Sequence, residues 1–82
     1  ADFVFRSDYN LRPLSEVEDF VKQNKHLPDV PTEEEIVRDG NDLGKTDAML
    51  LQKIEELTLY LIELKKEVDI LKNENRKLKN QK

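Results

Sequence analysis

Few residues in this 82-residue chain could do chemistry. Nucleophilic catalysis needs a hydroxyl or thiol, a base, and a third group that orients the base. The chain has no cysteine, one histidine (His26) and two serines (Ser7 and Ser15). Ser15 stands three residues before Glu18, the spacing of a capping box, so we assign it to a helix start. His26 precedes a Leu-Pro pair, where we expect a loop histidine that packs its ring.

Metal and phosphate chemistry have equally little support. With one histidine and no cysteine, a transition-metal site would need acidic ligands from several chains. The run Glu33–Glu35 reads as the first turn of a helix, where negative charge complements the helix dipole. Gly40 and Gly44 are the only glycines, so there is no glycine-rich phosphate loop. We therefore expect no enzymatic activity and no cofactor.

The strongest pattern is structural, and it lies in the second half of the chain. Leucine recurs every seventh residue, and a second set of residues occupies the intervening four- and three-residue steps. In heptad notation the d positions are Leu50, Leu57, Leu64, Leu71 and Leu78, and the a positions are Ile54, Leu61, Val68 and Asn75. An apolar seam with a period of 3.5 residues is buried by winding against a partner helix. The seam predicts a coiled coil, most simply with other copies of this chain.

Charges beside the seam predict the orientation of the partner. Position g holds Glu67 and Glu74, and position e holds Lys65, Lys72 and Lys79. In a parallel pair each g residue meets the following e residue of the partner, so Glu67 meets Lys72 and Glu74 meets Lys79. An antiparallel pair would place like charges together. The charges therefore favour parallel chains.

The number of chains is not decided by these residues. Asn75 and Val68 at a, with leucine at every d, favour two strands. Further apolar residues outside the seam, between Met49 and Ile62, favour three strands because a trimer buries more of each helix. Leu51, Leu59, Tyr60 and Ile62 form this second stripe. We expect the small N-terminal elements to pack on it.

The first 45 residues predict a small head. Phe3-Val4-Phe5 reads as a short strand, and the capping box at Ser15 opens a helix that ends near Asn24 or Lys25. Two prolines, Pro28 and Pro31, hold the following connector extended. A second capping box, Thr32 with Glu35, opens a short helix that Gly40 ends. The head has about a dozen large apolar residues, which is too few to fold alone.

A turn from Asn41 to Gly44 should separate the head from the long helix. Thr46 or Asp47 then caps this helix, which is about 34 residues and roughly 50 Å long. The predicted fold is thus mainly α: a head over residues 1–45, made of a short N-terminal strand and two short helices, packed on a coiled-coil helix over residues 46–82. The whole is a parallel homo-oligomer.

Charge and hydropathy argue against two classes of partner. Residues 65–82 carry seven Lys or Arg against three Asp or Glu, whereas the preceding part is acidic. A basic-region zipper has the opposite order, basic helix first and zipper second, so we expect no nucleic-acid binding. A basic helix end instead complements the helix dipole. The sequence has no apolar run of about 18 residues, so we expect no membrane insertion.

Several segments together resemble a known module. The chain is similar to the C-terminal module of long Bacteroidota surface and tail-fibre-like proteins, and the resemblance covers nearly the whole chain. It is carried by Ala1–Phe5, Tyr9–Leu14, Glu16–Glu18, Asn24–Pro28, Val30–Thr32, Asn41–Gly44 and Leu51–Tyr60. The resemblance implies a terminal cap, usually trimeric, on a fibrous protein at the cell surface, outside the cell or on a phage particle. It implies no catalytic residues.

A fainter similarity links the chain to the intramolecular chaperone domain of phage tail spikes and endosialidases. That domain begins with Ser-Asp, continues through short helices and ends in a coiled coil, and it cleaves itself at the serine. Ser7-Asp8 followed by Leu11-Arg12 resembles this start, but Pro13 and the looser spacing depart from it.

The predicted function is a non-catalytic C-terminal oligomerisation and folding cap that trimerises and registers an upstream fibrous protein. Two alternatives stay open. The head could be the receptor- or glycan-binding tip of an adhesin or tail fibre, in which case Phe3, Phe5 or Tyr9 should form an exposed aromatic cluster. The chain could instead be a self-cleaving chaperone with Ser7 at the cleavage site.

Overall fold

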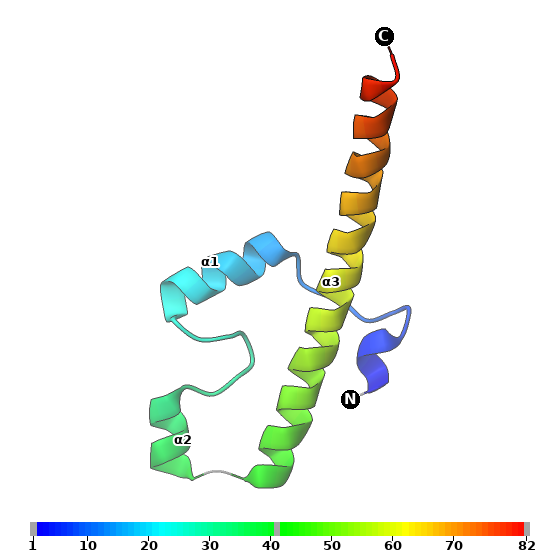
Figure 1. Ribbon diagram of the computed structural model, residues 1–82. Coiled ribbons are helices and arrows are strands. Elements are labelled where there is room, and N and C mark those ends of the chain that lie inside the picture. The colour runs from blue at the N-terminus through cyan, green and yellow to red at the C-terminus, as the bar shows by residue number, and fades with distance from the viewer. Residues whose placement is uncertain (1, 41, 82) are drawn as a thin grey trace.

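A single long helix dominates the computed structural model, which describes residues 2–40 and 42–81. The elements follow the order η1 (Asp2–Phe5), α1 (Leu14–Asn24), α2 (Glu33–Asp39) and α3 (Leu43–Lys79). The chain measures 65 × 29 × 18 Å. In Figure 1, η1 and α1 lie on opposite sides of α3, α2 lies toward the N-terminal end of α3, and the C-terminal half of α3 extends beyond the head.

The helix α3 begins earlier than the sequence predicted. Asp42 is its N-cap, and one Asp42 carboxylate oxygen accepts a hydrogen bond from the Lys45 backbone N–H at 3.1 Å. Thr46 and Asp47 therefore lie inside the helix, so their predicted capping role is wrong. Gly44 also lies in the first turn of the helix and not in a loop. Asn41, the first residue of the predicted turn, lies outside the described residues.

The predicted N-terminal strand is wrong. Residues Asp2–Phe5 form a 3-10 helix, and the described residues contain no β-strand. A strand needs a neighbouring strand to satisfy its backbone groups, and residues 2–40 and 42–81 offer none. The tighter turn buries Val4, which is 1% exposed, and η1 packs directly on α3.

Of the two predicted helix caps, the one at Thr32 is confirmed and the one at Ser15 is wrong. Thr32 caps α2 as predicted, with its hydroxyl accepting from the Glu35 backbone N–H at 3.1 Å, and Gly40 ends the helix at φ 85°. Ser15 does not cap α1. That helix begins at Leu14, directly after Pro13, and no side chain of the described residues caps it. α1 ends at Asn24, as predicted, with Lys25 in the left-handed conformation.

Candidate oligomerisation interface

The heptad seam is open to solvent along α3. Its eight apolar side chains keep between 37% (Val68) and 68% (Leu78) of their surface exposed. Asn75, the polar a position, is exposed as well. Burying a half-exposed leucine or isoleucine contributes about 1 kcal/mol. This stripe is therefore the largest reservoir of unburied apolar surface along α3.

The C-terminal part of the seam forms a shallow groove edged by charge. Val68, Leu71 and Leu78 contribute apolar surface to it, and Lys72 and Glu74 stand at its edges. Glu67, Lys72, Glu74 and Lys79 are all exposed. Within residues 2–40 and 42–81, none of these four forms an ion pair. Lys65, by contrast, already pairs with Asp69 at 2.6 Å.

The head is attached to faces of α3 other than the seam. Around the helix, positions g and c lie on one side of the seam, e and b on the other, and f opposite. Tyr9 donates a hydrogen bond to the Glu56 carboxylate (position c) at 2.6 Å and accepts one from the Gln52 amide (position f) at 3.2 Å. Tyr60 (position g) donates to the Arg12 carbonyl at 2.7 Å. These bonds hold the head while leaving the a and d positions uncovered.

Charged groups extend this attachment, which we call the polar clamp: Tyr9, Arg12, Asp29, Lys53, Glu56 and Tyr60. The Lys53 ammonium lies 2.9 Å from a Glu56 oxygen and 4.0 Å from an Asp29 oxygen. The Arg12 guanidinium lies 3.1 Å from Asp29. The clamp thus joins three separate segments: the linker before α1, the loop between α1 and α2, and α3. Lys53 and Glu56 are largely buried there. Solvent and salt therefore screen their ion pair less than they screen an exposed ion pair.

Both tyrosines of the clamp are biased toward their neutral forms. Burial, followed by the hydrogen bond to Glu56, raises the pKa of Tyr9 above its ordinary value. Burial, followed by the nearby charges of Glu56 and Glu63, raises the pKa of Tyr60. A deprotonated phenol could not donate to either the carboxylate or the carbonyl. The clamp therefore depends on both phenols keeping their protons.

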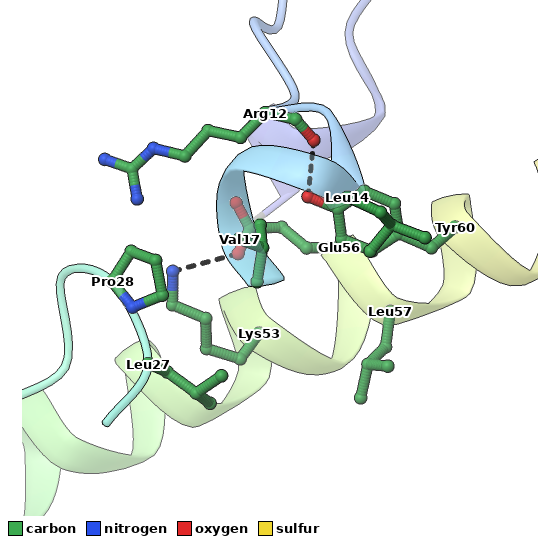
Figure 2. A pocket seen from close by; sticks show the side chains of 9 residues that line it. All are labelled: Arg12, Leu14, Val17, Leu27, Pro28, Lys53, Glu56, Leu57 and Tyr60. Atoms are coloured by element: carbon green, nitrogen blue, oxygen red, sulfur yellow. Dashed lines mark hydrogen bonds and ion pairs between the residues drawn. The ribbon is translucent and has the colours of Figure 1, made fainter. Parts of the chain in front are cut away.

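Beside the clamp, α1 and the loop after it enclose a hollow of about 180 Å³ against α3. Figure 2 shows its walls, with Leu14 and Val17 from α1, Leu27 and Pro28 from the loop, and Leu57 and Tyr60 from α3. Pro28 is buried, but Leu14 is 54% and Leu27 47% exposed. Because Leu57 is a d position of the seam, the hollow opens directly beside the seam.

The second apolar stripe predicted on α3 is only partly covered by the head. Leu59 and Tyr60 are half-buried, whereas Leu51 is 49% and Ile62 46% exposed. Glu55, on the same side as Ile62, is buried to 7% exposure, and one of its carboxylate oxygens has no hydrogen-bond partner among the described residues. The clamp itself was not predicted. Its signal in the sequence is four polar or amphipathic residues off the seam, at steps of one, three and four residues: Gln52, Lys53, Glu56 and Tyr60.

The residues considered for chemistry are placed apart from any common site. The His26 ring packs edge-on against Phe20, with ring centroids 5.2 Å apart, which confirms the predicted packing histidine. Ser7 is exposed on the linker after η1. Within the described ranges, no cluster of three or more potential metal ligands occurs. No helix there is long and apolar enough to span a membrane.

No protein-family model matches this chain, and no curated protein or solved structure matches it either.

Proposed function

We propose that this chain is a non-catalytic C-terminal oligomerisation and folding cap. One observation carries the proposal. The head docks on α3 through the f, c and g positions, while every a and d residue from Leu50 to Leu78 stays exposed. A helix that needed only its own head would present its leucine stripe to that head. A helix that forms a coiled coil with other chains needs its a and d residues free to contact them.

The partners in this proposal are parallel copies of the same chain, three in number. The unpaired Glu67 and Glu74 on one side and Lys72 and Lys79 on the other support the parallel orientation. Exposed Leu51 and Ile62 support three chains, because a trimer covers more of each helix than a dimer does. Asn75 at an a position would then fix the register of the chains at a cost in stability.

The proposed role is to set chain number and register for an upstream fibrous segment, in an extracellular, cell-surface or phage-particle setting. The resemblance to terminal modules of surface and tail-fibre-like proteins motivates this part. Holding three chains together raises their effective concentration. Long-range β pairing, which is slow because loop closure costs entropy, would then start from aligned strands.

Sedimentation equilibrium tests the proposal directly. The wild-type chain should sediment as a trimer. The double variant Leu64→Gln/Leu71→Gln removes two seam residues that are 54% and 62% exposed, and we expect it to be monomeric, with the head less protected against proteolysis. Ile70→Gln is the matched control, since Ile70 is 57% exposed on the same helix but at position c. A monomeric wild type, or a double variant that assembles as well as the control, would refute the proposal.

One observation favours a second function, recognition of a receptor or glycan by the head. Phe3 and Phe5 are 43% and 54% exposed, and the Phe3 ring lies 5.8 Å from that of Tyr9. Exposed aromatic rings are common contacts for sugars and proteins. Chemical shifts of these rings upon titration with host-surface glycans would test it; unchanged shifts in the assembled protein argue against a binding tip.

A further inference from the structure

Two exposed apolar patches remain on the chain outside the seam. The α1 patch comprises Leu14, Val17 and Val21, which recur at helical spacing along one face of α1, and it continues into Leu27. The flank patch comprises Leu51 and Ile62 on the e and b side of α3. Leu14, Val21 and Leu27 keep 36–54% of their surface exposed, and Leu51 and Ile62 keep 46–49%. Within the described residues of one chain both patches stay largely open to solvent, although Val17 is half-buried against the hollow.

The two patches lie at the same height along α3 but on opposite sides of its seam. The α1 patch meets α3 between Lys53 and Tyr60, which are g positions. The flank patch spans Leu51 to Ile62, at positions e and b. Because the seam stands between them, the α1 patch of one chain cannot cover the flank patch of the same chain. Figure 1 shows α1 projecting away from its own α3.

A parallel neighbour brings the two patches together. In parallel coiled coils in register, the g side of one helix meets the e side of the next at the same height. An antiparallel neighbour would pair g with g and place the Leu51–Ile62 stretch against the C-terminal half of α3. That half carries its apolar residues in the seam, with Ile70 as the exception.

We propose that α1 of each chain packs along the e side of a neighbouring copy's α3, with Leu27 against the neighbour's Leu51 and α1 against its Ile62. Glu55, which lies between these two residues at position b, is already buried within its own chain and is not part of the contact. This contact, the α1 clasp, rests on the proposed function and deepens it. The hollow beside Leu57 is incomplete in one chain and takes apolar side chains from the next. Each chain both provides and receives one clasp, so a ring of chains closes on itself.

Cross-linking tests the clasp, and the absence of natural cysteines makes the result unambiguous. The double variant Val21→Cys/Ile62→Cys, treated with a short bis-maleimide reagent, should form covalent species up to the full oligomer on denaturing gels. The matched control Val37→Cys/Ile62→Cys places the first thiol on α2, where Val37 is 80% exposed, and should give far less of the full-size product. Sedimentation of the untreated variant is measured in parallel.

The outcomes separate the clasp from the proposed function. Oligomers by sedimentation whose cross-links stay within single chains would overturn the clasp and leave the assembly role standing. A wild type that is monomeric by sedimentation would overturn both. As a second measurement, Leu14→Gln/Val21→Gln should raise the dissociation constant by about tenfold or more without changing the stoichiometry, since two apolar contacts per interface are lost. Val37→Gln is its control, and equal dissociation constants for the two would also overturn the clasp.

Discussion

The two halves of α3 present the same seam in different surroundings. From Leu43 to about Ile62 the helix carries the polar clamp, η1 and the hollow on its outer faces. From Glu63 to Lys79 no other element of the described part of the chain packs on the helix, and its side chains are exposed throughout. The first half has additional apolar residues at positions e, f and b, whereas the second half has charged residues at g and e.

We infer from this difference that the two halves of α3 have different roles: one sets orientation and register in the proposed coiled coil, and the other holds the head. In the bare half, orientation and register can be read only from the charges beside the seam and from Asn75. In the covered half, the outer faces of α3 bind the head through the clamp. A helix of uniform composition could not separate the two tasks.

The largest effect that would test this separation is expected at Val4. Apart from Pro28 it is the one apolar residue buried within the described residues, so Val4→Ala should lower the stability of the docked head by about 2 kcal/mol. Hydrogen exchange should accelerate in η1 and the linker, while sedimentation still reports the same oligomer. Val37→Ala is the matched control, because Val37 is 80% exposed on α2 and its truncation removes almost no contact.

Loss of the oligomer in Val4→Ala would contradict this separation of roles, because the half from Glu63 to Lys79 would then be unable to hold the chains together without a docked head. Equal exchange rates in the two variants would show that Val4 does not anchor the head.

A smaller effect, about 1 kcal/mol, is expected for the hydrogen bonds of the clamp. Tyr9→Phe removes the phenol that joins Glu56 to Gln52, and Tyr60→Phe removes the bond to the Arg12 carbonyl. Both should loosen the head and leave the bare half of α3 unchanged. Hydrogen exchange along α3 would report the difference, and faster exchange beyond Glu63 would contradict it.

Alkaline pH should weaken the same clamp. The pKa of each tyrosine is raised in the folded chain, so the stability that the phenols contribute is fully present below about pH 10, the ordinary value. It is lost as the pH rises through the folded-state values. Tyr9 and Tyr60 are the only tyrosines and there is no tryptophan, so near-ultraviolet tyrosinate absorbance follows both directly. Midpoints equal to those in concentrated denaturant would contradict the prediction.

How far the sequence predicts this fold depends on whether the signal is periodic or contextual. The long helix and its seam follow from nine residues at strict heptad spacing, which no neighbouring segment can alter. The helix start was missed because several residues can cap, and Asp42 precedes Thr46 and Asp47 along the chain. Ser15 failed as a cap because the helix begins immediately after Pro13, whose ring presets φ near the helical value.

The strand at Phe3–Phe5 and the clamp could not be read from local pattern. Alternating Phe-Val-Phe has high β propensity, but that propensity expresses a fit to neighbouring strands, which are absent from the described residues. The clamp joins residues separated by up to 48 positions, such as Tyr60 and Arg12. A single sequence shows each polar residue of such a pair, but it does not show that the two residues are in contact.

The smallest effect concerns the charges of the bare half, and it tests the parallel orientation on which the comparison depends. Glu67→Lys/Glu74→Lys and Lys72→Glu/Lys79→Glu each turn two attractive g–e contacts per interface into repulsive ones in a parallel coiled coil. Each contact contributes a few tenths of a kcal/mol. The quadruple variant restores attraction with the original net charge, so its thermal midpoint should return to the wild-type value. Lys66→Glu/Lys77→Glu, at positions f and c, has the same net charge as Lys72→Glu/Lys79→Glu and is the control for that variant.

In an antiparallel coiled coil the differences in thermal midpoint among these proteins should vanish. There g meets g and e meets e, so the wild type and both double variants all place like charges together and should melt alike. Added salt should compress the differences among the four proteins, because exposed charges are screened within about 10 Å at 0.1 M. Midpoints that separate at low salt, with the quadruple variant close to the wild type, can arise only if each Glu67 lies opposite a Lys72 of a chain running the same way.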